Sequence, residues 1–459
     1  MGYNISVSEF LESRDIDYGD FVAYVNAETR RLNSKLFFFQ SVCELKTVEQ
    51  NGKLSGLPVS VKDCICTKGI QSSAGSAILE GYKPPFDATV VSAIKNEGSQ
   101  ILGKTNQDEF GFGTFSVNSG YGVPKNPLDP ERTCGGSSGG AGGITAAATF
   151  PHIALAESTG GSISCPASFC GVVGLTPTYG LVSRYGLIDY ANSLDKIGPM
   201  GKTVDDVALM LSIIAGYDEM DSTSLPEKQK HYSTEGGIKG MVIGVPKEYF
   251  ENVDEQVSKS VWNTIKKMES AGASYVEISL PSTKYALSAY YIIATAEAST
   301  NLARYCGLRY GLHSELKEGQ SFNEYYAKTR SAGFGEEAKR RIILGTFARM
   351  SGYRDQYYMK ALKVRTLVIN EFKKAFKKCD LLAAPTMPIT APKFSDIQKL
   401  TPLENYQMDV LTVPPNLAGI PMLSVPCSSG KLPVGMHLMA DYLQEERLLK
   451  AGKVVEAVK

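Results

Sequence analysis

The stretch Cys134-Gly135-Gly136-Ser137-Ser138-Gly139-Gly140 is followed, about one helix later, by Ser158-Thr159-Gly160-Gly161-Ser162. Each run places serine beside paired glycines, and the small-residue segment 142–149 between them is typical of a helix. Glycine lets the backbone approach a substrate carbonyl closely and leaves N–H groups free to face a developing oxyanion. An isolated Gly-Ser run is typical of a flexible loop. Two runs that bracket a helix instead favour a hydrolytic serine site.

A serine nucleophile needs a base, and the chain offers an unusual candidate. The four histidines lie outside Gly-rich or acidic contexts, so we expect them to be structural or surface residues: His152, His231, His313 and His437. Lys62 ends an apolar strand expected at 57–62, and Ser-Lys pairs are a known alternative to Ser-His. A lysine held in an apolar pocket loses the solvation that favours its charged form and can accept a proton. A solvent-exposed lysine at a strand end is the alternative interpretation.

Composition limits what the chain does alone. Its 459 residues suffice for two or three domains, or for one large α/β domain. Lys plus Arg and Asp plus Glu number 48 each, so no net field draws the protein to nucleic acid or an anionic membrane. Any nucleic-acid contact would therefore come mostly from a partner. No apolar run reaches the roughly 18 residues of a membrane span, and the start at Met1 does not resemble a signal peptide.

The nine cysteines are scattered without the spacing of a disulfide framework. This usage predicts reduced thiols and a cytoplasmic location. Two close pairs, Cys64/Cys66 and Cys165/Cys170, lack the accompanying CxxC or paired histidines of a metal site. We expect them to be small buried hydrophobic residues.

Strand-like and helix-like patterns alternate along the chain. Strands are expected at 57–62, 100–103, 274–280, 381–384 and 432–439, and helices at 89–97, 202–217, 254–271 and 444–458, with a helix-rich stretch over 285–378. Thr89 and Thr203 are expected to cap two of these helices. The polar segment 221–237 is expected to be a surface insertion. The alternation predicts an α/β fold: one large domain with a mixed central β-sheet covered by helices on both faces.

Several of these segments resemble the amidase signature family. They are 134–140, 158–167 (STGGSISCPA), 171–180 (GVVGLTPTYG) and the lysine-bearing 56–63 (GLPVSVKD). The resemblance extends over nearly the whole chain and implies the amidase signature fold. It divides the single domain 1–459 into an N-terminal helical segment (1–50), a core with the catalytic residues (51–205) and a remainder with the substrate-binding residues (206–459).

The resemblance also implies residue roles. Ser162 would be the acylated nucleophile, Ser137 a proton relay next to a cis Gly–Ser peptide, and Lys62 the terminal base. The oxyanion would be held by N–H groups of Thr159, Gly160, Gly161 and Ser162. Arg341 and Asp409 would bind the two ends of glutamine, with Tyr290 nearby; a guanidinium suits a carboxylate and a carboxylate suits an ammonium. Taken alone, Arg341 within Lys339-Arg340-Arg341 is equally typical of a solvated helix face.

Within the family, four further segments are most similar to the glutamine-hydrolysing subunits of tRNA-dependent amidotransferases: 106–119, 183–200, 335–352 and 409–421. The resemblance implies that this chain releases ammonia from glutamine through a serine-linked acyl-enzyme. Partner B and C subunits would then use ATP and Mg to convert mischarged Glu-tRNA(Gln), or Asp-tRNA(Asn), to Gln-tRNA(Gln) or Asn-tRNA(Asn). No cofactor, metal or membrane contact is expected for this chain, and it has no P-loop motif.

The chain departs from the family pattern in three places. Ser158 stands where the family usually has Asp, Ser164 stands where it usually has Arg, and the segment around 149–152 is one residue longer. Three alternative functions stay open at this point. They are a free-standing amidase for small or fatty amides, a binding or scaffold protein with an inactive site, and phosphate binding by the Gly-rich loops.

Overall fold

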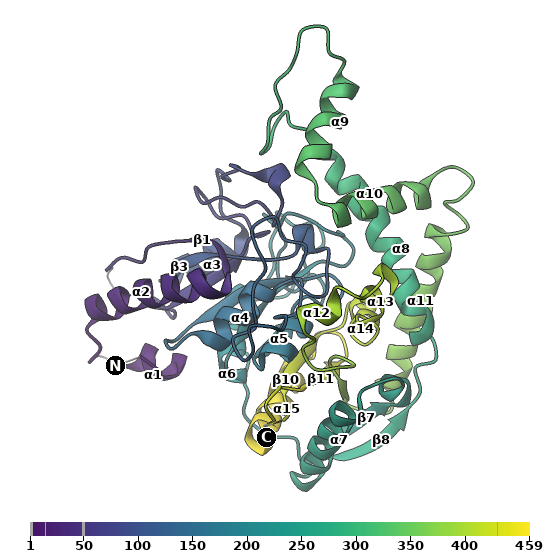
Figure 1. Cartoon of the computed structure of the whole chain (residues 1–459). Coiled ribbons are helices and arrows are strands. Elements are labelled where there is room, and N and C mark those ends of the chain that lie inside the picture. The colour runs from purple at the N-terminus through teal and green to yellow at the C-terminus, as the bar shows by residue number, and fades with distance from the viewer. Residues whose placement is uncertain (1–2, 14, 48–50, 429) are drawn as a thin grey trace.

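One sheet of eleven strands runs through the part of the chain that the structure describes, residues 3–13, 15–47, 51–428 and 430–459 of a computed structural model (Figure 1). The strands are β1 (Phe39–Val42), β2 (Pro58–Lys62), β3 (Gln100–Thr105), β4 (Ile153–Ser158), β5 (Val173–Thr176), β6 (Lys196–Gly201), β7 (Val242–Pro246), β8 (Ser274–Ile278), β9 (Leu381–Pro385), β10 (Met422–Pro426) and β11 (Gly435–Ala440). Their order across the sheet is β1-β3-β2-β4-β6-β5-β10-β11-β9-β7-β8. Because β2 pairs parallel with β3 and β4 whereas β6 and β10 pair antiparallel with their neighbours, the sheet is mixed.

Helices cover both faces of this sheet. They are α1 (Val7–Glu12), α2 (Tyr18–Leu36), α3 (Thr89–Asn96), α4 (Gly139–Ala147), α5 (Ser164–Cys170), α6 (Val204–Ile214), α7 (Glu255–Ser270), α8 (Thr283–Asn301), α9 (Phe322–Gly333), α10 (Glu336–Arg349), α11 (Tyr358–Ala375), α12 (Phe394–Ile397), α13 (Pro402–Gln407), α14 (Val413–Ala418) and α15 (Glu445–Val458). On one face, Gly435 of β11 packs against Ser168 of α5 and Ser424 of β10. On the other face, Gly452 of α15 packs against Leu423, because neighbouring residues of a strand point to opposite sides. The predicted fold class is confirmed.

Several predicted elements are confirmed with shorter bounds. The helix expected at 202–217 is α6, where Thr203 caps the first turn reciprocally with Asp206 and the helix ends before Gly216. Thr89 does not cap its helix: Ala88 occupies that position, and the Thr89 hydroxyl donates to Asp218 at 2.6 Å. The side chain finds a better acceptor on a distant loop than in its own first turn.

The N-terminal segment is helical only as far as Leu36. Phe39–Val42 then forms β1, which pairs antiparallel with β3 at the edge of the sheet. An edge strand of four residues has too short a pattern to distinguish it from a loop, so sequence alone missed it. The expected boundary between 50 and 51 adjoins residues 48–50, which lie outside the described residues.

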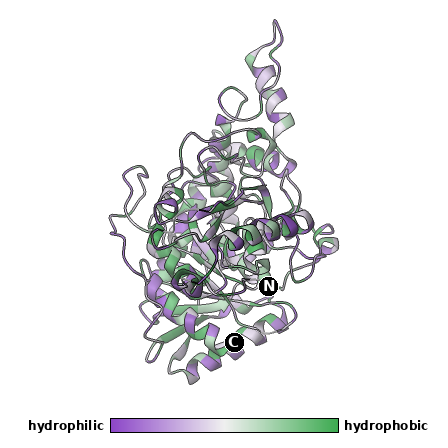
Figure 2. Ribbon diagram, turned by 90° about the vertical axis from the view of Figure 1, so that its left-hand side faces the viewer, coloured by the Kyte–Doolittle hydropathy of each residue, from purple (hydrophilic) through white to green (hydrophobic). Residues whose placement is uncertain are grey.

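The strands that carry the catalytic loops are buried on both faces. Every residue of β2, β4 and β6 is buried, and Figure 2 shows hydrophobic residues concentrated toward the interior of the body. The region around α9 projects from that body at the top of both views. In the described part of the chain, no helix has the length and apolar character needed to cross a bilayer.

Candidate active site

Lys62 is fixed at the carboxyl end of β2, in the middle of the parallel trio β3-β2-β4. Its side chain is fully buried, and its Nζ lies 2.8 Å from Ser137 Oγ and 3.0 Å from the main-chain oxygen of Glu157. The alternative of a solvent-exposed lysine is therefore wrong. Apolar residues of β2 on both faces keep water from this amine, and the partners that remain belong to the serine loop and to β4.

Ser137 lies in the loop that leads into α4, beside a cis peptide bond between Gly136 and Ser137. A Cβ atom on Gly136 would lie 2.3 Å from Asp108 Oδ2, so only glycine fits there. The N–H of Ser138 donates to the main-chain oxygen of Ser162 at 3.3 Å. This bond joins the two glycine-serine runs directly.

Ser162 ends the second run, just before α5. Its side chain lines a small cavity together with Gly111, Gly113, Gly136, Gly160, Gly161, Tyr290, Arg341 and Asp409. Within the described part of the chain, Ser162 Oγ has no hydrogen-bond partner. The hydroxyl is therefore presented to the cavity and not held by a neighbouring side chain.

The loop before Ser162 requires glycine for close packing. A Cβ on Gly160 would lie 2.5 Å from the ring of Tyr290, and a Cβ on Gly161 would lie 2.3 Å from Thr412 Oγ1. Neither glycine N–H donates to another described residue, so both stay available to an oxyanion. Thr159 differs from them, because its side chain turns away from the cavity toward Glu157 and Asp195.

Asp409 lines the same cavity as the glycine loop. Its carboxylate accepts hydrogen bonds from Thr114 Oγ1 at 3.0 Å and from the hydroxyl of Tyr291 at 2.6 Å. Burial raises the pKa of Asp409 to about 6, against the opposing effect of those two hydrogen bonds. At neutral pH the group is therefore mostly ionised and suited to an ammonium.

Arg341 reaches the same cavity from α10. It is buried, so the interpretation as a solvated helix face is wrong for this residue. Its Nε donates to Glu337 at 2.8 Å and its Nη1 to the Tyr190 hydroxyl at 2.6 Å. Among the described residues, Nη2 has no partner. The guanidinium is thus held in place by two groups while one edge stays open to a ligand.

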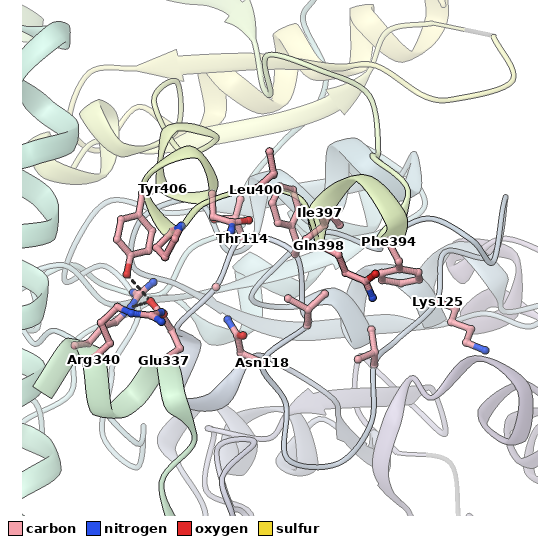
Figure 3. Close-up of a pocket in the computed structure, with 17 residues that line it drawn as sticks. Thr114, Asn118, Lys125, Glu337, Arg340, Phe394, Ile397, Gln398, Leu400 and Tyr406 are labelled. Carbon is pink, nitrogen blue, oxygen red and sulfur yellow. Dashed lines mark hydrogen bonds and ion pairs between the residues drawn. The ribbon is translucent and has the colours of Figure 1, made fainter.

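Aromatic rings surround this guanidinium. Its central carbon lies 5.0–5.6 Å from the centroids of four rings: Phe112, Tyr190, Tyr291 and Tyr406. Cation–π contacts stabilise a buried charge that few carboxylates neutralise. A wider cavity of about 610 Å³ adjoins the small one and shares Gly113 and Arg341 with it. In Figure 3, Glu337, Arg340 and Tyr406 lie together at one end of this wider cavity, and Lys125 and Phe394 at the other.

The cavity thus brings together six of the sequence-predicted site residues: Gly160, Gly161, Ser162, Tyr290, Arg341 and Asp409. Lys62 and Ser137 contact each other outside its lining, and Thr159 does not line it. Two further positions differ from the family pattern. Ser158 Oγ is buried and has no partner among the described residues. Ser164 Oγ lies 3.5 Å from Nε2 of the buried His437 and not beside Ser158. The hydroxyls of Ser158 and Ser164 therefore do not form a hydrogen bond with each other at the positions where the family usually has Asp and Arg.

Four functional contacts were missed by sequence reasoning. Glu157 touches Lys62, Glu337 holds Arg341, and Thr114 and Tyr291 hold Asp409. Glu157 is the acid immediately before Ser158, so it was visible in the sequence as a charge inside an otherwise apolar strand. The other three carried no such signal.

Comparison with known proteins places this geometry in a family. The family model described as Amidase matches residues 40–449. The chain belongs to the amidase family. Within it, the chain is 51% identical over 407 residues to the A subunit of Glutamyl-tRNA(Gln) amidotransferase from Methanococcoides burtonii, covering 88% of this chain and 85% of that protein. It is 50% identical over 412 residues to the protein of the same name from Halothermothrix orenii, with 89% and 85% covered.

A solved structure of an amidase-family member has the same fold. The A subunit of Glutamyl-tRNA(Gln) amidotransferase from Thermotoga maritima superposes with a TM-score of 0.85 at 38% identity, covering 98% of this chain and 94% of that one. Within the described residues, no group of three or more His, Cys, Asp or Glu side chains is arranged to hold a metal ion.

Proposed function

We propose that the chain is the glutamine-hydrolysing subunit of a tRNA-dependent amidotransferase. The observation that carries the proposal is one cavity that is lined by Ser162, by a half-buried carboxylate, Asp409, and by a buried guanidinium with an open edge, Arg341. A free α-amino acid offers an ammonium and a carboxylate to such a pair, whereas a simple amide needs neither charge. The names of the amidase-family relatives support the same proposal.

The proposed reaction uses Ser162, Ser137 and Lys62 in the roles that the family resemblance implies, and the contact of Lys62 Nζ with Ser137 Oγ at 2.8 Å supports its second proton transfer. Ser162 Oγ attacks the side-chain amide carbon of glutamine, and its proton passes to Ser137 Oγ while the Ser137 proton passes to Lys62. The carbonyl π electrons move onto oxygen, which the N–H groups of the glycine loop stabilise. When the carbonyl re-forms, the C–N bond breaks and the nitrogen takes the proton back along the same path. Ammonia leaves, and water then attacks the glutamyl ester to release glutamate.

The remaining steps would belong to partner subunits. We infer that B and C subunits bind ATP and Mg, activate mischarged Glu-tRNA(Gln) or Asp-tRNA(Asn), and receive the ammonia. The absence of net charge on this chain supports a division in which tRNA is bound elsewhere. All nine cysteines lie among the described residues and are free thiols, which supports action in the reducing cytoplasm.

Exposed apolar side chains support the existence of a protein partner. They gather on the outer side of α10 and on the turn after it: Ile343, Leu344, Phe347, Met350, Tyr353 and Tyr357, each at least 40% exposed. The ring centroids of Phe347 and Tyr353 lie 4.5 Å apart, so the exposed apolar surface is contiguous between these two residues. Monomeric proteins seldom leave such surfaces uncovered.

The test is a comparison of glutamine hydrolysis by the pure chain with that by the chain co-purified with its partner subunits. ATP, Mg and mischarged tRNA are then added to the complex. We expect slow hydrolysis by the chain alone and faster hydrolysis in the charged complex, with the released nitrogen recovered on the tRNA. A chain that hydrolyses neutral amides at full rate without partners, and glutamine no better, would favour the free-standing amidase instead.

A further inference from the structure

Glu157 forms a buried ion pair with the residue proposed to be the terminal base. Glu157 Oε2 lies 2.8 Å from Lys62 Nζ, and both side chains are at most 4% exposed. Lys62 Nζ therefore has three close oxygen neighbours: Ser137 Oγ, the Glu157 main-chain oxygen and the Glu157 carboxylate. Two of the three come from one residue, so Glu157 defines both the position and the electrostatic environment of this amine.

The three contacts fit both protonation states of Lys62. An ammonium donates to all three oxygens, and a neutral amine donates twice to Glu157 and accepts from the Ser137 hydroxyl. The same geometry thus serves before and after proton transfer. Rotation of the amino group about the Cε–Nζ bond exchanges the two arrangements without moving the nitrogen, and this keeps the relay short.

The contacts of the second carboxylate oxygen of Glu157, Oε1, bear on which of two acids, Glu157 or Asp195, is ionised. Thr159 Oγ1 lies 2.8 Å from Glu157 Oε1 and 2.8 Å from Asp195 Oδ1. A hydroxyl has a single proton and donates it to one acceptor. The other contact is favourable only where that carboxyl carries a proton and donates it to Thr159 Oγ1.

The Lys62 ammonium, 2.8 Å from Glu157, favours the ionised form of that carboxylate. Burial, followed by the charge of Glu157, raises the pKa of Asp195 well above the ordinary value, against the N–H bonds that Asp195 accepts from Tyr190 and Ala191. We therefore assign the proton to Asp195. Asp195 then donates to Thr159, and Thr159 donates to Glu157. A hydrogen-bonded chain of buried groups runs from Asp195 through Thr159 and Glu157 to Lys62, and the carboxylate beside Lys62 stays ionised.

We propose that Glu157 is a positioning residue for Lys62 whose carboxylate receives a proton during acylation. This inference rests on the proposed serine-lysine chemistry. At rest Lys62 is an ammonium and Glu157 a carboxylate. One N–H proton of Lys62 passes to Glu157 Oε2, the amino group turns about the Cε–Nζ bond so that its lone pair faces Ser137 Oγ, and Nζ then accepts the Ser137 proton. Lys62 thereby regains its charge and Glu157 becomes neutral. The proton returns by the same path when the nitrogen leaves, and no other reactant is needed.

Other titratable groups surround this pair. Cys64 follows β2, Asp108 lies on the loop after β3, and Lys196 begins β6. Burial raises the pKa of the Cys64 thiol well above its ordinary value, raises that of Asp108 to about 6 and lowers that of Lys196 to about 7. Because the charge of Glu157 also raises the pKa of Asp195 and of Lys196, the pH profile of a neutral Glu157 variant is compared with that of Glu157→Asp, which keeps the charge.

The experiment measures kcat and KM of Glu157→Gln against pH, for glutamine and for a small neutral amide. Gln keeps the shape and the hydrogen-bonding capacity of Glu but cannot take the proton. At pH 7 we expect kcat to fall about 100-fold or more for both amides, with KM changed by less than about threefold. Activity should return as the pH rises, because Lys62 must then lose its proton to solvent before it accepts one from Ser137.

Two further variants complete the design. Glu157→Asp keeps the charge and should recover part of kcat with the native pH profile. Glu445→Gln removes another buried carboxylate, one that accepts from the Thr178 N–H at 2.9 Å away from the site, and should retain kcat within about twofold. If Glu157→Gln does not fold, Glu157→Asp tests the proposal by itself. Activity of Glu157→Asp with the native pH profile would support the proposal, and activity found only at alkaline pH would contradict it.

The proposal is overturned if Glu157→Gln keeps near-native kcat at pH 7, or if its profile moves toward acid. Either result would mean that Glu157 only stabilises the ammonium. The neutral amide separates this outcome from the proposed function. If the native protein hydrolyses that amide but not glutamine, the glutaminase proposal fails while the test of Glu157 remains complete.

Discussion

The two walls of the Ser162 cavity are built in different ways. One wall consists of small residues from two short runs of the chain, and its glycines pack too closely for any side chain at Gly160 or Gly161. The other wall consists of long side chains from α8, α10 and the segment after α13, segments far apart in sequence, which supply Tyr290, Arg341 and Asp409. The first wall serves bond making and breaking, where backbone N–H groups and short relays are needed. The second serves recognition, where charge is needed at a distance.

The walls also differ in how their charges are held. On the catalytic wall, Lys62 has a carboxylate partner in direct contact and no free edge. On the recognition wall, Arg341 forms an ion pair with Glu337 and contacts aromatic rings, while its Nη2 has no partner among the described residues. A charge that moves protons is enclosed by protein, whereas a charge that binds substrate keeps one side accessible. Substitutions on the two walls should therefore affect different kinetic parameters.

The largest effect is expected on the catalytic wall. Ser162→Ala should abolish glutamine hydrolysis, because no other serine or threonine of the described residues lines the small cavity. Ser137→Ala and Lys62→Ala should each lower kcat by about two to four orders of magnitude, since each interrupts one proton path. The three losses should not add, because the residues act as a unit. Steady-state kinetics on the folded variants tests this, and near-native turnover by Lys62→Ala would remove the lysine-base mechanism.

A smaller and selective effect is expected on the recognition wall. Arg341→Ala and Asp409→Asn should each weaken use of glutamine by about 2–5 kcal/mol in kcat/KM and spare a small neutral amide, because each leaves one substrate charge unpaired. In the native protein, KM for glutamine should rise as the pH falls through about 6, where Asp409 gains a proton. Asp409→Asn should lack that dependence. Equal losses of kcat/KM for glutamine and for the neutral amide would show that Arg341 and Asp409 do not act by binding the charges of glutamine.

The smallest effect is expected at Lys196, next to the catalytic wall, and it concerns the free energy of unfolding. Lys196 of β6 lies directly across from Ser158 of β4, and neither Lys196 Nζ nor Ser158 Oγ has a partner among the described residues. Burial, followed by the charge of Arg365, lowers the pKa of Lys196 from 10.5 to about 7. The unfolded chain then binds more protons between those two pH values, so the free energy of unfolding rises with pH across that window.

Lys196→Met should remove this penalty while keeping the volume. We expect its free energy of unfolding at pH 7 to increase by about 1–3 kcal/mol and to depend less on pH between neutral and alkaline conditions. Urea unfolding at pH 7 and at alkaline pH measures both changes. A variant less stable than the native protein at pH 7 would show that Lys196 has a stabilising partner.

The catalytic wall was largely predictable from sequence and the recognition wall only by resemblance. Ser137, Ser162 and Lys62 lie in short motifs whose glycines and apolar flanks report their local chemistry. Arg341 and Asp409 are placed by the packing of α8 against α10 and of the segment 405–412 against both, which no local pattern encodes. Glu157 was missed for another reason: it lies 95 positions from Lys62, and only the parallel pairing of β2 with β4 brings them together.

The helices and strands, like the site residues, were only partly predictable from the sequence. Helix α7 was predictable because one of its faces is polar and the other apolar. Helix α6 was predictable from the capping residues of its first turn, although it is buried on nearly all sides. Strands β4 and β6 were not found, although β2, which is equally buried on both faces, was predicted. β4 is rich in alanine and β6 contains glycine and proline, so neither has the residues typical of a strand that mark β2.

The most direct test of the account is to identify the side chain that carries the acyl group. The complex is mixed with glutamine, quenched in acid during turnover, digested and analysed by peptide mass spectrometry. The account predicts a γ-glutamyl group on Ser162, absent from Ser162→Ala and accumulated when deacylation is slowed. A γ-glutamyl group on Ser137, Ser138 or a cysteine, or turnover of glutamine by Ser162→Ala, would contradict it.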